Sequence, residues 1–137
     1  MRPPLDPPEF DLDMESEVLA IAERFDGEWH NGGFSQFFSN WNPPDASLVS
    51  EGLRRLGVPE AAKVVDDAIA AMGEDMTLWR ERGHAALIGS DTELRERLWA
   101  LNYAFDPYEK ALTAAMERYE RMLARKSGDP FVDEDET

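Results

Sequence analysis

The chain has no cysteine, few cations and no long apolar run. The lack of cysteine excludes disulfide frameworks, thiolate catalysis and cysteine-based zinc sites, and it fits a reducing compartment, so we expect a cytoplasmic protein. No segment approaches the length of a membrane-spanning helix, and the proline-rich start has no apolar core typical of a signal peptide. Three lysines and eleven arginines stand against 29 acidic residues, which leaves a formal net charge of -15.

This negative charge argues against direct binding to nucleic acid, because phosphate contacts would form against the field of the protein itself. Basic proteins are the expected partners. Residues 1–17 hold six acids and one base, and residues 127–137 hold five acids and no base. The residues between these ends carry a net charge of only -5, so acidity that serves solubility alone is an open alternative to a functional acidic surface.

The 137 residues suit a single domain that buries its own core. Four prolines among the first eight residues oppose helix and sheet, and the acidic residues near the other end bury no apolar area. We therefore expect a disordered proline-rich tail over residues 1–12, a helical domain over 13–126 and a disordered acidic tail over 127–137.

Apolar residues recur every three or four positions through this domain, and no alternating strand pattern of useful length occurs. The predicted fold is all-α, a single-domain bundle of about five to seven helices. Asp45 is the expected N-cap of one helix, and Gly57 is its expected left-handed stop. The expected helices cover about residues 13–28, 34–41, 46–56, 59–72, 75–88, 91–105 and 106–125, and residues 90–93 form the capping box of the sixth.

A double glycine at positions 32 and 33 lies between two aromatic-rich segments. Glycine can adopt positive φ, so the chain is expected to reverse here between two helices. A phosphate-binding loop is not favoured, because no strand precedes the glycines and no lysine follows them. We expect the nearby side-chain amides to hydrogen-bond backbone groups left free at this corner. The residues of this structural signature are Glu28, Asn31, Gly32, Gly33, Phe34, Gln36 and Asn40.

The pattern Glu-x-x-Asn-Gly-Gly-Phe-x-Gln resembles the signature of a bacterial domain of unknown function that forms the C-terminal part of a small DNA-mimic protein. An aromatic link at 101–108 and the helix after it resemble the closing element of that family, so the resemblance spans about residues 15–125. It implies a helical fold. It also implies a function, because the best-described relative is an acidic protein whose carboxylates imitate DNA phosphates on the DNA-binding face of a transcription regulator.

Two classes of function are open. The first is a non-enzymatic interaction module, acting as a DNA mimic, regulator or antitoxin-like inhibitor, that binds the basic face of a DNA-binding protein. The second is a small-ligand binder or enzyme that uses the amides of Asn31, Gln36 and Asn40. We favour the first, because the sequence contains no catalytic constellation. Its predicted docking patch consists of acids on helix faces, namely Glu51, Glu60, Asp66, Asp67, Glu74 and Asp75.

No metal and no cofactor are expected. Glu81 and His84 have the Glu-x-x-His spacing of di-iron bundles, but such a site needs two copies of the motif, and His30 has Gly27 three residues before it. The motifs His-Glu-x-x-His and Gly-x-Ser-x-Gly are also absent from the sequence. Aromatic residues at helical spacing are expected in the core, except that Trp41, beside two prolines, is the expected partly exposed contact residue.

Overall fold

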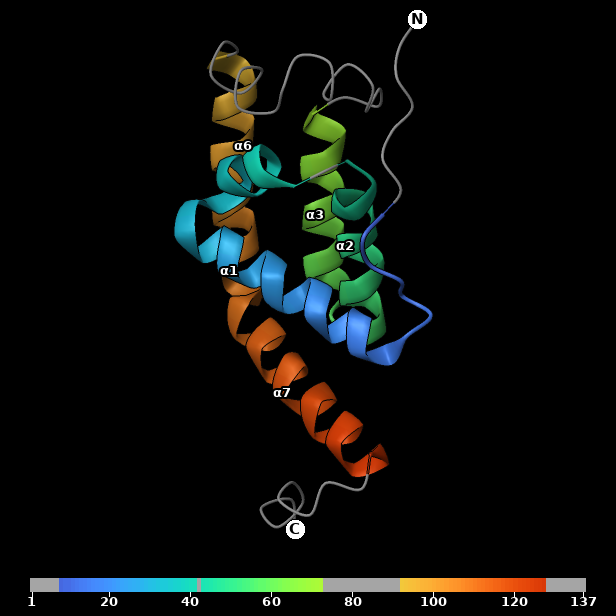
Figure 1. Ribbon diagram of the computed structural model, residues 1–137. Coiled ribbons are helices and arrows are strands. Elements are labelled where there is room, and N and C mark those ends of the chain that lie inside the picture. Colours follow the sequence, from blue (N-terminus) through green and yellow to red (C-terminus); the bar gives the residue numbers. More distant parts are fainter. Residues whose placement is uncertain (1–7, 42, 73–91, 128–137) are drawn as a thin grey trace, which may run out of the picture.

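The computed structural model describes residues 8–41, 43–72 and 92–127 (Figure 1). Every regular element in these stretches is helical, which confirms the predicted all-α class. The elements are α1 (Glu15–Asn40), α2 (Pro43–Leu56), α3 (Pro59–Met72), α6 (Thr92–Phe105), the 3-10 turn η1 (Asp106–Tyr108) and α7 (Glu109–Lys126).

Part of the prediction falls outside these stretches. The expected helix over 75–88, which enters the predicted total of five to seven, is not among the described residues. The same holds for the outer parts of both expected tails, residues 1–7 and 128–137. Within the described ranges, no helix is both long enough and apolar enough to cross a membrane.

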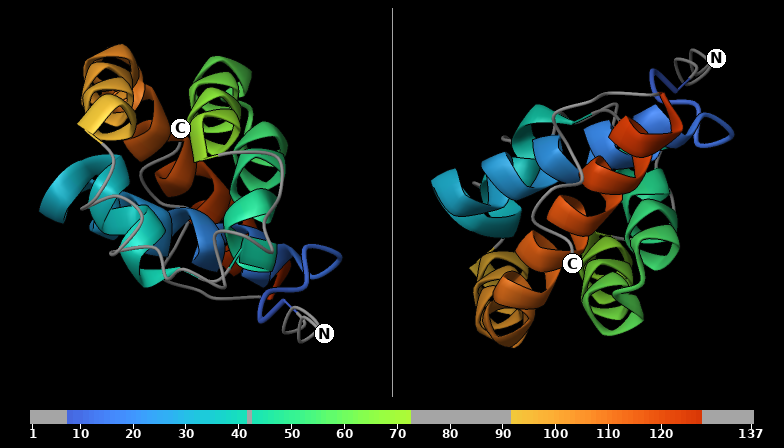
Figure 2. Two further views of the ribbon diagram at one scale, coloured as in Figure 1. Left: turned by 90° about the horizontal axis from the view of Figure 1, so that it is seen from above. Right: turned by 90° about the horizontal axis from the view of Figure 1, so that it is seen from below.

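The bundle is organised around α1, which contacts α2, α6 and α7. α2 and α3 run side by side and pack against each other, and α3 also packs against α6 (Figures 1 and 2). α7 crosses α1 and touches α2, as the view from below in Figure 2 makes clear. The turn η1 leads directly from α6 into α7, so the first residues of α7 lie beside α1.

Aromatic side chains form the centre of the bundle. Phe25, Phe34, Phe37 and Phe105 are fully buried. The ring of Phe25 lies 5.0 Å from that of Phe37 and 5.5 Å from that of Phe105, both edge to face. Such pairs add roughly 0.5–1.5 kcal/mol each beyond the burial of their area, so they hold the two halves of α1 and the end of α6 together.

The double glycine interrupts α1. Gly32 has φ -167° and ψ 18°, and Gly33 has φ 68° and ψ -158°, so neither residue is helical. The helix resumes at Phe34, which agrees with the predicted corner between two helical segments. Only Gly33 lies in the left-handed region, because the extended φ of Gly32 is open to any residue.

α2 begins earlier than predicted. Its first residue is Pro43, so Asp45 lies inside the first turn, and its prediction as the residue before the helix was wrong. Proline fits the first turn because its missing N–H would have no helical partner there. The other end is as predicted: Gly57 has φ 92°, and the N–H of Val58 donates to the carbonyl of Leu53 over 3.0 Å, which closes the helix in a Schellman motif.

The chain packs on the bundle before the expected domain limit at residue 13. The buried carboxylate of Asp45 accepts the N–H groups of Glu9 and Phe10 at 2.8 and 3.1 Å. Leu12 is buried, and Arg55 of α2 donates to its carbonyl over 2.5 Å. This stretch, expected in the disordered tail, therefore joins the fold because Asp45 and Arg55 satisfy its backbone groups.

Trp41 is buried, which corrects its predicted role as a contact residue. It is 2% exposed, its ring stacks on that of Phe10 at 5.9 Å, and the Arg24 guanidinium lies 5.0 Å from its centroid. Among the described residues, the exposed aromatic side chains are those of Trp99 and Tyr103 of α6, at 63% and 67%. The prediction failed because the stretch that covers Trp41 was expected to be disordered.

Candidate functional site

Asn102 of α6 holds the corner at the double glycine. Its Oδ1 accepts the N–H of Phe34 over 2.9 Å, so one helix caps the second half of another. A Cβ atom on Gly33 would lie 2.5 Å from the Asn102 amide nitrogen. Glycine is therefore required at position 33 both by its left-handed φ and by the space that Asn102 occupies.

The amides of the signature do not converge on one point. Asn40 donates to the Glu28 carboxylate over 3.0 Å and so ties the two halves of α1 together. Asn31 is exposed and Gln36 is half-buried, and neither side chain hydrogen-bonds to another described residue. The amide that reaches a free backbone group at this corner is that of Asn102, which lies far away along the chain.

A cleft of about 320 Å³ opens beside this corner. Trp29 of α1 lines it together with Trp99, Asn102, Tyr103 and Asp106. Trp99 and Tyr103 contact each other edge to face at 5.8 Å, and both remain largely exposed. The cleft is therefore mostly aromatic, with one amide and one carboxylate among its lining groups.

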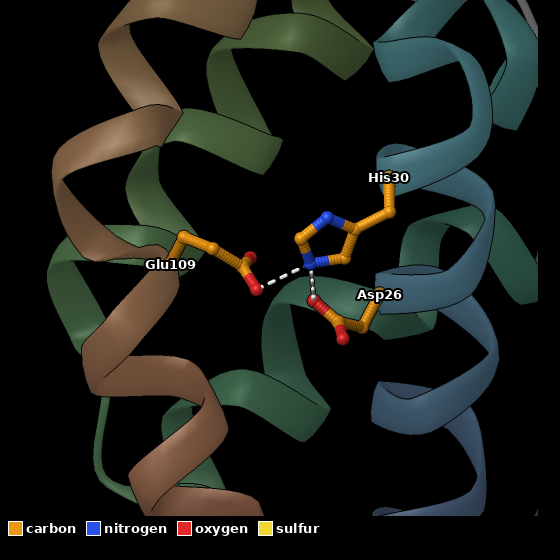
Figure 3. Close-up of side chains that lie close together, drawn as sticks. All are labelled: Asp26, His30 and Glu109. Carbon is orange, nitrogen blue, oxygen red and sulfur yellow. Dashed lines mark hydrogen bonds and ion pairs between the residues drawn. The ribbon is translucent and has the colours of Figure 1, made fainter.

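Asp26 and His30 of α1 face Glu109, the first residue of α7 (Figure 3). The His30 Nε2 lies 2.5 Å from Glu109 Oε1 and 3.4 Å from Asp26 Oδ1. The side chains of Asp26 and Glu109 are only 19% and 16% exposed, whereas His30 is half-exposed. One ligand atom from each residue lies within 4.8 Å of the others, so this group can share a proton or hold a metal ion.

The surroundings of Asp26 and His30 shift the pKa values of both groups. Burial, followed by the adjacent Glu109 carboxyl group, raises the pKa of Asp26 to about 6, against the opposing charge of His30. The pKa of His30 is also raised, mainly by its hydrogen bond to Glu109; burial opposes this shift, and the charges of both carboxylates add to it. The cluster therefore retains protons at pH values at which a free aspartate has lost its own.

Sequence reasoning missed this cluster. The one available signal was the spacing of Asp26 and His30, because residues four apart lie on the same face of a helix. The third member, Glu109, follows 79 positions after His30 and meets it only because α7 crosses α1. The prediction tested only for a glutamate three residues before His30, where Gly27 stands.

A family model described as DMP19-like protein matches residues 11–125. The chain belongs to the DMP19-like family. The DMP19-like region begins shortly before α1 and ends one residue before the end of α7, so it contains the corner, the cleft and the Asp26–His30–Glu109 cluster. No curated protein and no solved structure matches the chain.

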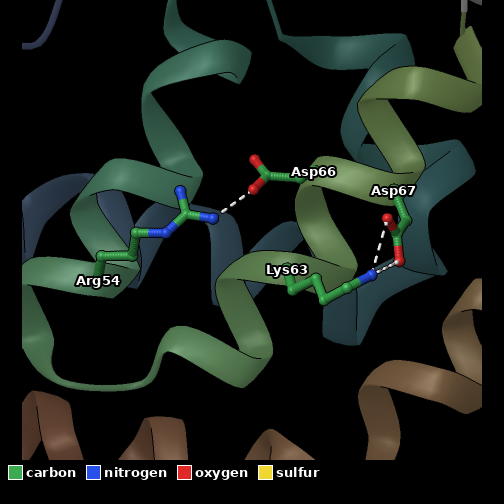
Figure 4. Close-up of polar contacts among 4 residues, drawn as sticks. All are labelled: Arg54, Lys63, Asp66 and Asp67. Carbon is green, nitrogen blue, oxygen red and sulfur yellow. Dashed lines mark hydrogen bonds and ion pairs between the residues drawn. The ribbon is translucent and has the colours of Figure 1, made fainter.

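The acids predicted as a docking patch lie on α2 and α3 of this DMP19-like fold, where several have basic partners (Figure 4). Arg54 of α2 hydrogen-bonds to Asp66 of α3, and Lys63 donates to Asp67 over 3.0 Å. Exposed pairs of this kind contribute little to stability. Their larger effect is on the surface potential, because each cation offsets the carboxylate beside it.

The other four acids of the predicted patch differ in whether they have a basic partner. Glu51 accepts a hydrogen bond from Arg55 over 3.2 Å. Glu60 forms no ion pair with another described residue. Glu74 and Asp75 lie outside the described residues. Of the four described members of this patch, three thus have an arginine or lysine that offsets their charge.

A second acidic stretch has few basic residues beside its acids. Residues 8–41 contain eight acids and a single lysine or arginine, Arg24. Asp13, Glu17 and Glu23 form no ion pair with any other residue that the structure describes. Among the described stretches, net negative charge is therefore concentrated on residues 8–41, which include the first half of α1 and the stretch before it.

Proposed function

We propose that this protein is a non-enzymatic acidic interaction module that binds, as a DNA mimic, the basic face of a DNA-binding protein such as a transcription regulator. One observation carries the proposal: among the described residues, the carboxylates of Asp13, Glu17 and Glu23 have no cation beside them. No neighbouring cation cancels the negative potential of these carboxylates, so they attract the basic groove in which a DNA-binding protein holds DNA phosphates. Membership of the DMP19-like family supports the same function.

The backbone that presents these carboxylates is held in place. Asp13 and Glu17 flank the start of α1, and the stretch before them is tied down by Asp45 and Arg55. A fixed surface loses little conformational entropy on docking, which favours affinity. The acids of residues 128–137 add an attraction whose range is a Debye length, about 8 Å at physiological ionic strength.

The predicted patch on α2 and α3 is the alternative placement for the same function. Glu51, Asp66 and Asp67 would have to exchange an internal cation for one from the partner, which cancels much of the electrostatic gain. We therefore place the docking surface on the first half of α1 and the stretch before it.

Two triple variants with the same change in net charge test this placement. The first converts Asp13, Glu17 and Glu23 into amides, D13N/E17Q/E23Q. The control does the same to the three paired acids, E51Q/D66N/D67N. Each is used as bait in a pull-down from lysate of the source cell, with elution by a salt gradient and identification by mass spectrometry.

We expect the wild-type protein and the control to retain a DNA-binding protein that its own operator DNA displaces, and the first variant to lose it. Loss in the control with retention in the first variant would move the surface to α2 and α3. If the wild-type protein retains nothing that DNA displaces, the DNA-mimic function is wrong. Titrations with the purified partner at low and high salt then measure each Kd, because a charge-driven complex weakens with salt.

A further inference from the structure

The Asp26–His30–Glu109 cluster has no part in the docking function proposed above. Its two carboxylates are mostly buried and share one imidazole (Figure 3). Asp26 Oδ1 and Glu109 Oε2 are also buried without a hydrogen-bond donor from the described residues. Buried carboxylate oxygens are costly unless a donor or a cation compensates them, so this group has unused capacity to bind a ligand.

The separations between the donor atoms are close to those in a metal site. His30 Nε2 lies 2.5 Å from Glu109 Oε1 and 3.4 Å from Asp26 Oδ1. Around an ion with bonds of about 2.0–2.1 Å, neighbouring ligand atoms lie roughly 2.9–3.4 Å apart in octahedral or tetrahedral geometry. A small outward movement of the Glu109 side chain brings its separation from His30 Nε2 into that range, and the three donor atoms already lie within 4.8 Å of one another.

The backbone supplies these donors from two helices. Asp26 and His30 are one turn apart on α1, so their side chains leave the same face. Glu109 begins α7 directly after the 3-10 turn that contains Pro107, which limits how far the helix start can move. Three protein ligands leave at least one coordination position for water, as in many zinc sites.

We infer that Asp26, His30 and Glu109 bind a divalent transition-metal ion of the Zn²⁺ class, and that this ion links α1 to the start of α7. An imidazole with carboxylates suits Zn²⁺, whereas Mg²⁺ prefers an all-oxygen shell. The ion takes the place of the proton that His30 Nε2 shares with Glu109, so Nε2 becomes the ligand atom. His30 is half-exposed, which gives the ion a path to the site.

The test is calorimetric titration of chelator-treated full-length protein with zinc chloride at physiological salt. We expect saturable binding of one ion per chain and no comparable response to magnesium chloride. Each of Asp26→Asn, His30→Asn and Glu109→Gln should weaken binding by at least about tenfold. Circular dichroism of each variant establishes that it has folded.

Two control variants separate this site from general attraction by acidic groups. Glu117→Gln removes the same charge as Glu109→Gln from an exposed position on the same helix, and His84→Asn removes the other histidine of the sequence. Both should bind Zn²⁺ as the wild-type protein does. A response to Mg²⁺ equal to that to Zn²⁺, or unchanged affinity in the three ligand variants, would overturn the inference.

The absorption spectrum of the wild-type protein with Co²⁺ in place of Zn²⁺ gives an answer that needs no variant. Visible bands that saturate at one ion per chain, and that added Zn²⁺ abolishes, support the site; the spectrum of free aqueous Co²⁺ contradicts it. The pull-down described above, repeated with chelator, keeps the two proposals apart, because docking through the α1 acids needs no metal.

Discussion

The polar contacts on the surface of α3 and those at the corner of α1 differ in how far apart their partners lie in the sequence and in how deeply they are buried. On α3, Lys63 and Asp67 are one helical turn apart and exposed. At the corner of α1, the buried Phe34 relies on Asn102, which lies 68 positions further along the chain. An exposed local pair adds little to stability, whereas a buried group that loses its partner bears its full desolvation cost. The surface contacts can therefore change freely, while the corner cannot.

The largest effect is expected at the corner. Gly33→Ala places a Cβ atom 2.5 Å from Asn102 and forces alanine into a left-handed φ, so we expect the free energy of unfolding to fall by about 3 kcal/mol. Gly27→Ala is the control in the same helix, where nothing lies within 4 Å of the new Cβ. There we expect a gain of about 0.5–1 kcal/mol. Urea denaturation measures both, and effects of the same sign would contradict the account of the corner.

Asn102→Ala is expected to lower the free energy of unfolding by a smaller amount. It leaves the buried N–H of Phe34 without an acceptor, which should cost about 2 kcal/mol. It also removes the side chain that a methyl group at position 33 would meet, so the double variant with Gly33→Ala should lose less stability than the sum of the single variants. Asn31→Ala, at an exposed position, should change stability by less than about 0.5 kcal/mol. Strict additivity in the double variant would count against the close contact.

The pH dependence of stability should distinguish the buried cluster from the surface pairs. Folding raises the pKa of Asp26 to about 6 and so favours its protonated form. The resulting stabilisation is complete below the unfolded pKa, about 4, and is lost as pH rises through about 6. With chelator present, Asp26→Asn should therefore raise the free energy of unfolding by about 1 kcal/mol near pH 7.5 and leave it unchanged near pH 4. Denaturation curves at the two pH values measure this, and a gain that is equal at both would contradict the assignment.

The smallest effect is expected at the surface pairs. A double-mutant cycle with Lys63→Met and Asp67→Asn should give a coupling of no more than about 0.5 kcal/mol, because both side chains are exposed. High salt should remove most of it. Urea denaturation measures this coupling. A coupling as large as the stability lost in Asn102→Ala would contradict the distinction between the surface pairs and the corner.

Patterns within a few residues were sufficient to predict much of the helical architecture. The helix over 59–72 has the predicted limits, the helix expected after the capping box at 90–93 ends at Phe105 as predicted, and Gly57 ends α2 as predicted. Apolar periodicity, proline at a helix start and glycine at a helix end all act over one or two turns, so they can be recognised without the fold. The corner at Gly33 was predicted for the same reason.

The features that sequence reasoning missed depend on residues far apart in the chain. Asn102 and Glu109 gain their roles from α1, which lies about 70–80 positions earlier, and Trp41 is buried by a stretch some 30 positions before it. Counting charges revealed the acidity, but not which carboxylates have cations beside them. That distinction depends on how α2 and α3 face each other, and on which basic side chains reach α1.

The enclosure of Trp41 between Phe10 and Arg24 gives the chain an intrinsic optical reporter. The indole N–H of Trp41 is buried with no acceptor among the described residues, so its fluorescence should appear at short wavelength, whereas that of the exposed Trp99 should appear at long wavelength. If the stretch that carries Phe10 detached, water would reach the Trp41 ring and shift its emission to the red. A partner that lifts this stretch off the bundle would thus be detectable from the colour of the emitted light.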